Sequence, residues 1–237
     1  ALARYLHECV LFSNTLGQLG RNVRHLMRAE IAEVREEVMP GRMGSSAMPH
    51  KKCNPKDWEQ LDGMSDVVSD EYAKVLGTLK SEHARDLTGS CIRRFFPVIV
   101  ILVAHQLETL LRKKGGKSLI ERMHFDTLRA KELVHFKGKS TLAEPLYCAL
   151  ARAGYPDAHR LVREKIAPLI QSLGPWQALE YVASRERDPC LDAAIRSMPP
   201  TAKSLLQLGY TQAYIGDAKS IAGVEAARAV GFVASYK

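Results

Sequence analysis

The chain has 237 residues, 46% of them hydrophobic and 25% charged, with a formal net charge of +8 at pH 7. Such a chain can bury the core of one or two soluble globular domains. The longest apolar run, Phe95 to Ala104, is about half of the roughly 20 residues that a membrane span requires, so no membrane partner is expected. The basic residues are spread through amphipathic patterns without an aromatic-rich RNA-binding motif, so we expect an anionic substrate and no nucleic acid.

The cysteines indicate a reducing compartment. They are five in number and widely spaced, at Cys9, Cys53, Cys91, Cys148 and Cys190. An odd count without metal-ligand spacing favours reduced thiols in a cytoplasmic protein over a disulfide or zinc framework. The first residues contain no secretory signal, because Arg4, His7 and Glu8 interrupt any apolar core there.

Residues 1–38 carry the periodicity of one long helix, which Pro40 ends. Apolar residues recur along it mostly at three- and four-residue steps, as in a helical bundle: Leu2, Cys9, Phe12, Leu16, Leu19, Val23 and Leu26. Gly17 and Gly20 weaken this helix but permit the close approach of a neighbour.

A second helical pattern begins at Asp57, which fits an N-cap, and a third covers about 90–112. The apolar stripe of the second is Trp58, Leu61, Ser65, Val68, Tyr72, Val75 and Leu79. The third is apolar nearly all round over 95–103, so we expect it to be buried on most sides, with Pro97 in its first turns or at a kink. Three rods of this length cannot bury their seams as an isolated trio, which predicts oligomerisation.

The stretch 113–116, Lys-Lys-Gly-Gly, is the best domain boundary, and shorter helical patterns follow it. They lie at about 117–124, 126–136, 140–153, 157–173, 175–185, 189–197 and 216–230. Their ends are marked by cap-like Ser140 and Asp157 and by stop-like Gly154, Gly174 and Gly209. No run shows sustained strand alternation, so the sequence predicts an all-α fold, with a long-helix bundle at 1–112 and a small helical domain at 113–237.

The segment 40–57 is dense in small, turn-forming and cationic residues, and prolines interrupt any helix inside it. Residues 44–55 are Gly-Ser-Ser-Ala-Met-Pro-His-Lys-Lys-Cys-Asn-Pro. Adjacent hydroxyls, an imidazole, two ammonium groups and an amide are more chemistry than a connector needs, and loops on rigid helices often carry functional groups. We therefore interpret 40–57 as a functional loop, with a basic polar connector as the alternative.

This loop resembles the signature of the fumarase/aspartase superfamily, Gly-Ser-Ser-x-Met-Pro-x-Lys-x-Asn-Pro. Every fixed position is matched, apart from one extra residue, Cys53. The superfamily consists of lyases that expel fumarate from a succinyl group, and the resemblance implies no metal or organic cofactor. His50, at a variable position of the signature, makes the loop similar to that of the adenylosuccinate lyases within this superfamily.

The loop supplies a candidate base. Expelling fumarate requires a base, cations that hold the charge building up beside a carboxylate, and an acid for the leaving nitrogen. The resemblance implies that Ser45 is the base, with Ser46 as the alternate. Serine is a weak base unless a cation stabilises its alkoxide, and Lys51 is the nearest such neighbour in the sequence. Turn hydrogen bonding is what either serine would do in a loop without this signature.

The resemblance also implies the residues that hold the substrate. Lys51 and Asn54 match the lysine and asparagine that bind the substrate carboxylate, and Met48 lies in the same substrate-binding loop. Glu59, counted past the extra Cys53, matches a glutamate that orients the acid histidine. Without the resemblance, Glu59 is a solvated carboxylate favoured by a helix start.

A second constellation covers residues 83–94, His-Ala-Arg-Asp-Leu-Thr-Gly-Ser-Cys-Ile-Arg-Arg. Ser90 and Arg94 lie four residues apart at a predicted helix start, where free N–H groups and a guanidinium suit a phosphate. The pattern is similar to Arg-Asp-x-Thr/Ser-x-Ser-x-x-x-Arg of the adenylosuccinate lyases. The resemblance places nucleotide and phosphate binding on Arg85, Ser90 and Arg94, whereas arginines at a helix start are ordinarily solvated.

The resemblance covers nearly all of the chain, but the chain lacks two upstream signatures of the superfamily, one of which contains the acid histidine. The resemblance therefore predicts that the chain is part of a lyase and is inactive alone. It also implies that the whole lyase is a homotetramer whose active sites draw on three subunits. The whole enzyme would split adenylosuccinate into AMP and fumarate, and also the succinyl-carboxamide ribonucleotide of purine synthesis. The alternatives are a sister lyase such as carboxymuconate cycloisomerase or argininosuccinate lyase, a non-catalytic helical scaffold, and, least favoured, a basic nucleic-acid-binding bundle.

Overall fold

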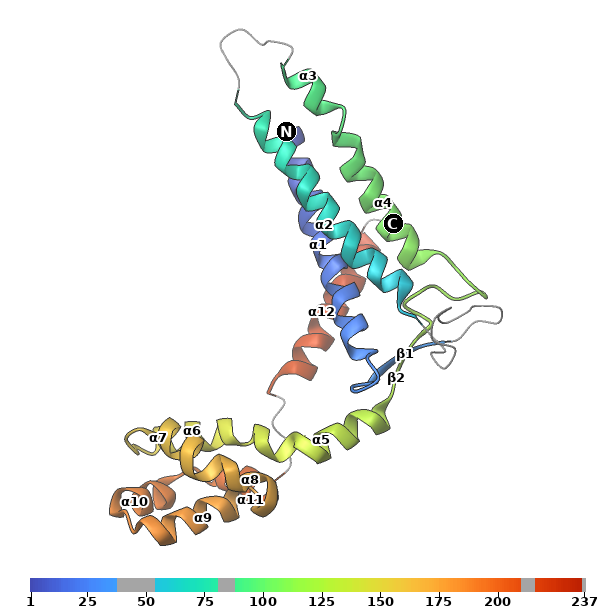
Figure 1. The fold of residues 1–237 in the computed structure, drawn as a ribbon. Coiled ribbons are helices and arrows are strands. Elements are labelled where there is room, and N and C mark those ends of the chain that lie inside the picture. The colour runs from blue at the N-terminus through green and yellow to red at the C-terminus, as the bar shows by residue number, and fades with distance from the viewer. Residues whose placement is uncertain (38–53, 81–87, 210–215, 236–237) are drawn as a thin grey trace. The chain divides into compact units, whose positions relative to one another are not determined.

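The computed structural model describes residues 1–37, 54–80, 88–209 and 216–235, and they form two compact units, Ala1–Arg129 and Ala130–Lys237. The first unit contains α1 (Leu2–Leu26), β1 (Val34–Glu36), α2 (Lys56–Gly77), α3 (Thr88–Arg93), α4 (Phe96–Leu111) and β2 (Met123–Phe125). Helix α5 (Thr127–Thr141) begins in the first unit and continues into the second. The helical content confirms the all-α fold class (Figure 1).

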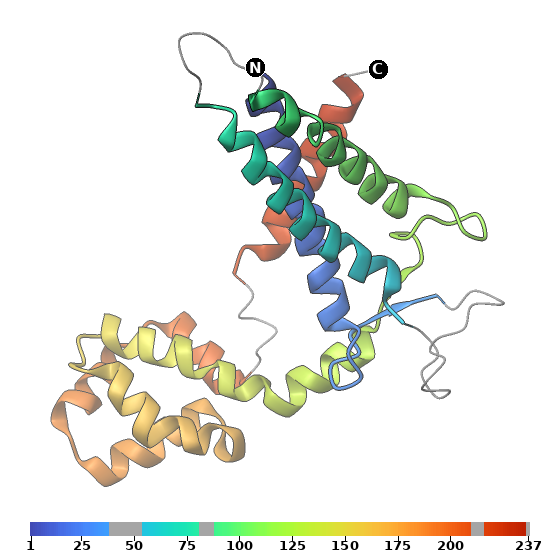
Figure 2. The ribbon, with the colours of Figure 1, turned by 45° about the horizontal axis from the view of Figure 1, so that its top comes forward.

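The first unit is a bundle in which α1, α2 and α4 pack side by side (Figure 2). The buried face of α1 consists of Leu6, Val10, Ser13, Leu16, Gly17, Gly20 and Val23. This face is rotated from the predicted seam, because Leu2 and Phe12 are 54% and 42% exposed. The small residues explain the rotation, since Gly17 and Gly20 face α2 at its closest approach. Their predicted role in close packing is therefore confirmed.

Helix α2 follows its predicted apolar stripe closely. Trp58, Leu61 and Val68 are fully buried, and only Leu79, which lies beyond the last turn of α2, is largely exposed. The predicted third helix is in fact two, because α3 ends at Arg93 and α4 starts anew at Phe96 with Pro97 in its first turn. Proline is favoured in a first turn, where its missing N–H leaves no helical bond unmade.

The apolar stretch of α3 and α4 is only partly buried in the bundle. Ile99 and Val103 pack against α1 and α2, whereas Ile101 is 63% exposed, so the expectation of burial on most sides is wrong for this chain. By length and composition, Gly89–Leu111 could also cross a membrane, with a mean hydropathy of 1.5, contrary to the estimate from the shorter run 95–104. Core helices of soluble proteins meet the same test of length and composition, so this match alone assigns no membrane span.

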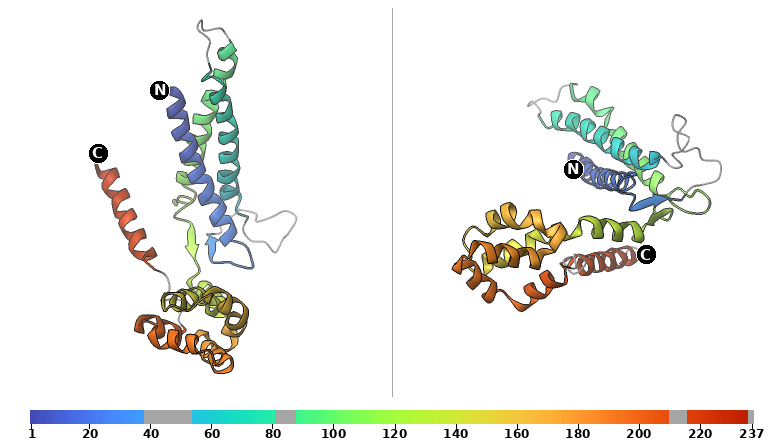
Figure 3. Two further views of the ribbon diagram at one scale, coloured as in Figure 1. Left: turned by 90° about the vertical axis from the view of Figure 1, so that its left-hand side faces the viewer. Right: turned by 60° about the horizontal axis from the view of Figure 1, so that its bottom comes forward.

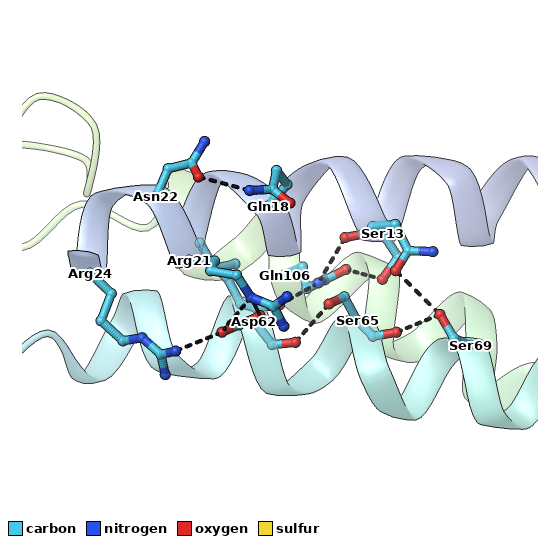
Figure 4. A network of polar contacts seen from close by, with 11 residues as sticks. Ser13, Gln18, Arg21, Asn22, Arg24, Asp62, Ser65, Ser69 and Gln106 are labelled. Atoms are coloured by element: carbon cyan, nitrogen blue, oxygen red, sulfur yellow. Dashed lines mark hydrogen bonds and ion pairs between the residues drawn. The ribbon is translucent and has the colours of Figure 1, made fainter. Parts of the chain in front are cut away.

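A polar network crosses the middle of the bundle (Figure 4). The Ser13 hydroxyl donates to Gln106 Oε1 at 2.8 Å, and Gln106 Nε2 donates to the Leu61 carbonyl at 2.9 Å. Both side chains are fully buried, so the network joins α1, α2 and α4 in one register. Buried polar groups are tolerated only when they are hydrogen-bonded, and here they specify which helix faces meet.

Replacing Gln106 with leucine is expected to lower the free energy of unfolding by about 2 kcal/mol, because the Ser13 hydroxyl would stay buried without its acceptor. Gln18→Leu is the matched control, since Gln18 bonds Asn22 on the exposed side of α1 and its loss should cost less than about 0.5 kcal/mol. Urea titration of each variant measures the difference. Adding Ser13→Ala to Gln106→Leu should recover part of the loss, and a variant no weaker than Gln18→Leu would contradict the role of the network.

Helix α1 ends at Leu26, not at residue 38 as predicted, and the chain then forms β1. Strand β1 pairs antiparallel with β2, with Val34 opposite Phe125 and Glu36 opposite Met123. This pairing brings the segment after α4 into the first unit, where Leu119 is fully buried in the bundle core. The compact units therefore divide after Arg129, later than the predicted boundary at 112.

The core of the second unit is formed by short helices between residues 143 and 208, and the last helix of the chain buries none of its residues. After α5 come α6 (Ala143–Arg152), α7 (Ala158–Leu161), the π-helical turn η1 (Val162–Ile166), α8 (Ala167–Leu173), α9 (Pro175–Glu186), α10 (Pro189–Ser197), α11 (Pro200–Leu208) and α12 (Ala218–Ser235) (Figure 3). Gly174 and Gly209, which were predicted as stops, follow α8 and α11 with positive φ. Ser140 lies inside α5 and does not cap a helix. Asp157 precedes α7 without a side-chain capping bond and pairs with Arg160 at 2.7 Å. Helix α11 was not predicted.

Tyr155 and Asp188 form a hydrogen-bonded pair within the second unit. The Tyr155 hydroxyl donates to Asp188 Oδ2 at 2.9 Å, and burial together with this partner raises the pKa of Tyr155 to about 12. Asp188 caps α10 by accepting from the Cys190 amide, and this bond and the one from Tyr155 lower the pKa of the carboxyl. Helix α10 is thus capped by a carboxylate whose pKa lies below its usual value.

Candidate active site

Four of the predicted site residues lie in the described part of the chain: Asn54, Glu59, Ser90 and Arg94. The others, Ser45, Ser46, Met48, Lys51 and Arg85, lie outside the described residues. The structure therefore defines the two ends of the predicted loop and the helix that carries part of the second constellation.

The loop leads directly into α2. The carbonyl of Asn54 accepts a hydrogen bond from the Lys56 amide at 2.7 Å, and that of Pro55 accepts one from the Glu59 amide at 2.8 Å. Trp58, fully buried, anchors this first turn in the core. The Glu59 side chain is on the exposed side of the same turn. Asn54 and Glu59 are thus held on a rigid helix start, with Glu59 accessible to a partner from elsewhere.

The sequence suggested that Asp57 caps α2, and this prediction is wrong. Asp57 is instead a buried residue that anchors the first turn of α2. Only 4% of the residue is exposed, and its Oδ2 lies 2.7 Å from Lys114 Nζ and 3.6 Å from Arg122 Nη2. The cap position is taken by Pro55. Both cations belong to the segment after α4, so this segment lies against the start of α2.

The strand on the other side of the loop is held by the same segment. Arg122 Nε and Nη2 each lie 3.4 Å from Glu36 Oε1, and both side chains are only 1% exposed. Lys117 Nζ lies 2.6 Å from Glu37 Oε2, and its hydrogen bond lowers the pKa of that carboxyl. The Glu37 amide donates to the Arg122 carbonyl at 2.8 Å. Residues 36 and 37 are thus fixed by side chain and backbone alike.

Sequence reasoning missed the four buried or half-buried ions of this cluster: Glu36, Asp57, Lys114 and Arg122. A glutamate such as Glu36 in a predicted helix is ordinarily solvated. Buried charges occur in compensating pairs, but the sequence does not tell which charges are buried, so it could not identify this cluster.

The second constellation sits at the other end of α2. Helix α3 packs there through Ile92, and the Lys74 ammonium of α2 lies 4.3 Å from the centre of the Phe95 ring. Ser90 is exposed within α3, and Arg94, also exposed, follows its last residue, so the predicted shared helix is shorter than expected. The two side chains are accessible to a ligand, with Arg94 in the turn that links α3 to α4.

The two parts of the predicted site are far apart in one chain. Helix α2 separates them, and its 22 residues span roughly 33 Å at 1.5 Å per residue. Figure 1 shows α3 at one end of α2 and the β1–β2 pair at the other. No mononucleotide is that long, so Asn54 and Ser90 of one chain cannot hold the same small substrate. Within the described ranges, no group of three or more His, Cys, Asp or Glu side chains is placed to hold a metal ion.

Comparisons with known proteins identify the family. A family model described as Lyase matches residues 1–69, which include the predicted loop. The chain is 32% identical over 168 residues to the adenylosuccinate lyase of Pyrococcus horikoshii, covering 68% of this chain and 35% of that protein. It is 31% identical over 164 residues to the N-acetyl-S-(2-succino)cysteine lyase of Dickeya dadantii, again covering 68% of this chain and 35% of the relative.

A solved structure agrees with these sequence matches. The 3-carboxy-cis,cis-muconate lactonizing enzyme of Pseudomonas putida superposes with a TM-score of 0.57 at 26% identity, over 88% of this chain and 47% of that one. The chain spans about a third of the length of the curated relatives named above. The loop motif, the helical bundle and these matches lead to one conclusion: the chain belongs to the fumarase/aspartase superfamily of lyases and corresponds to part of such a protein.

Proposed function

We propose that the protein containing this chain cleaves adenylosuccinate to AMP and fumarate by β-elimination, and acts likewise on the succinyl-carboxamide ribonucleotide of purine synthesis. The observation that carries this proposal is the presence of two motifs on one chain, the serine loop and the Arg85–Arg94 constellation. A fumarate-expelling lyase needs the first, and only a substrate with a phosphate needs the second. The similarity to the Pyrococcus adenylosuccinate lyase supports the same choice.

In this mechanism Ser45 removes the proton beside the succinyl carboxylate. Lys51 and Asn54 hold that carboxylate while negative charge builds up on it. Glu59 orients a histidine that protonates the leaving nitrogen, and this histidine comes from outside the chain. The exposed position of Glu59 on the first turn of α2 suits such a partner. Arg94, with Ser90 and Arg85, binds the phosphate at the far end of the substrate.

We further propose that the active protein is a homotetramer and that each site combines residues of different subunits. The roughly 33 Å length of α2 supports this, because Asn54 and Arg94 of one chain lie too far apart to hold one substrate. The exposed apolar residues of the bundle, such as Ile101 and Leu76, supply surface for such an assembly. Reduced cysteines favour the cytoplasm as its location.

The test is fumarate release by the full-length protein from adenylosuccinate, argininosuccinate and N-acetyl-S-(2-succino)cysteine, with lactonisation of 3-carboxymuconate assayed in parallel. Turnover of adenylosuccinate above the others is expected. Turnover of carboxymuconate instead would contradict the proposal and favour the activity named for the solved relative. A folded tetramer silent on all four substrates would favour the non-catalytic scaffold.

Replacing Arg94 with methionine in the full-length protein is expected to raise KM for adenylosuccinate about ten- to a hundredfold, because one charge-assisted hydrogen bond to the phosphate is lost. Arg93→Met is the matched control, since the Arg93 guanidinium lies against Gly89 of its own helix, 3.7 Å from where a β-carbon would be. Steady-state kinetics on both variants measure the difference. An equal effect of the two substitutions would show that Arg94 has no special role.

A further inference from the structure

The chain runs through the predicted loop between two buried carboxylates. Glu36 lies at the end of β1, before the loop, and Asp57 lies in the first turn of α2, after it. Their side chains are 1% and 6% exposed. Two buried carboxylates require compensating cations, because an unpaired buried charge is strongly destabilising. The cations that meet them therefore determine where the two ends of the loop lie.

One guanidinium reaches both carboxylates. Nη2 of Arg122 lies 3.4 Å from Glu36 Oε1 and 3.6 Å from Asp57 Oδ2. Nη1 donates to the Lys117 carbonyl at 3.0 Å, which fixes the plane of the guanidinium. Lys114 Nζ adds a bond to Asp57 at 2.7 Å, so Asp57 lies beside two cations. Arginine suits this position because its planar fork can bind two partners at once, which a lysine ammonium on a flexible stem does not replace.

We propose that Arg122 is a positioning residue for the active-site loop: it joins Glu36 and Asp57 and so fixes the spacing at which the loop starts and ends. The proposal rests on the proposed function, in which the loop carries the base and the carboxylate-binding groups. Arg122 touches no substrate. It acts through the two carboxylates, and a displacement of about 1 Å in catalytic groups is enough to reduce turnover about a hundredfold.

Arg122→Lys in the full-length protein is the decisive variant, because it keeps the buried positive charge and loses the bridge. Turnover of adenylosuccinate is expected to fall at least tenfold while the tetramer persists. Arg122→Met should lower turnover further and also lower the unfolding temperature, since both carboxylates lose a partner. If the methionine variant fails to fold, the lysine variant alone decides. Wild-type turnover in Arg122→Lys would overturn the proposal, because charge compensation alone would then suffice.

Arg35→Met is the matched control. Arg35 belongs to the same strand pair and forms an ion pair with Asp126 at 2.8 Å, but its side chain is 66% exposed. Exposed pairs contribute little, so turnover is expected to stay within about twofold of wild type. A loss equal to that of Arg122→Lys would mean that any weakening of the strand pair disturbs the site, and the special role of Arg122 would be lost.

Hydrogen exchange separates positioning from general stability and does not depend on the substrate. In Arg122→Lys, the amides of 34–37 and of the first turn of α2 are expected to exchange at least tenfold faster together, while those around Gly17 on α1 stay unchanged. Unchanged flanks, or faster exchange throughout the bundle, would overturn the proposal. A wild-type protein inactive on adenylosuccinate would refute the proposed function, and the exchange result would still decide whether Arg122 joins the two ends.

Discussion

Gly20→Ala is expected to lower the free energy of unfolding by about 3 kcal/mol, because α1 and α2 leave no room for a β-carbon there. A β-carbon on Gly20 would lie 2.5 Å from the carbonyl oxygen of Trp58 and 3.0 Å from the β-carbon of Leu61. The first of these atoms belongs to the backbone, so no side-chain rotation can relieve the overlap. Urea titration followed by circular dichroism measures the loss.

Gly63→Ala is the matched control for Gly20→Ala. Gly63 lies within α2 on its exposed side, and no heavy atom lies within 4 Å of an added β-carbon. Alanine is the better helix former, so this variant should be more stable than wild type by roughly 0.5–1 kcal/mol. A Gly20→Ala protein as stable as Gly63→Ala would refute the close contact of α1 with α2.

Gly17 allows a sharper check of the same contact. Its added β-carbon would meet two atoms of one side chain, Ser65 Oγ at 2.1 Å and Ser65 Cβ at 2.5 Å. Ser65→Gly removes both atoms, so it should partly restore the stability of Gly17→Ala and do nothing for Gly20→Ala. Recovery in both backgrounds, or in neither, would contradict the packing described.

Ser45→Ala is expected to lower turnover of adenylosuccinate by the full-length protein by about 10²–10⁴-fold, the usual contribution of a general base. Alanine removes the hydroxyl that takes the proton in the proposed mechanism and changes the size of the side chain little. KM should change far less than kcat, because the proposed mechanism assigns carboxylate binding to Lys51 and Asn54 and not to Ser45. Stopped assays of fumarate release measure both constants.

Ser46→Ala is the control for Ser45→Ala, since the two serines are adjacent and chemically identical. It should retain turnover within about tenfold of wild type, a loss smaller than that from removing a general base. If Ser46→Ala is the silent variant instead, the base is Ser46. If both variants turn over normally, the loop does not carry the base, and the proposed mechanism fails although the superfamily membership stands.

The helices could be predicted where their signal is local. The stripe from Trp58 to Val75 repeats at three- and four-residue steps, and α2 buries that stripe. The end of α1 could not be predicted, because residues 27–37 are rich in charges that suit a helix surface as well as a turn. Strands β1 and β2, of three residues each, are too short to show alternation. Their pairing depends on a partner far along the chain.

The sequence suggests candidate residues for the site but does not reveal the buried ions beside the ends of the loop. Ser45, Lys51 and Asn54 were identified from a motif, which lists residue types and not surroundings. Arg122 and Glu36 interact across 86 positions, and each alone looks like an ordinary surface charge. Burial of charge is a property of the folded chain, since it exists only where the opposite charge has also been brought in.

The pairing of β1 with β2 has a consequence for synthesis of the protein. A ribosome completes α1 and α2 well before Arg122 is made, so these two helices can pack while Glu36 still lacks its buried partner. At 5–20 residues per second, the 86 positions between Glu36 and Arg122 take roughly 4–17 s to translate. During that time the nascent chain holds the start of the loop without the strand that later fixes it. Contacts so distant in sequence also slow folding in general, because loop closure must come first. The loop flanks are therefore expected to be the last part of the bundle to mature on the ribosome.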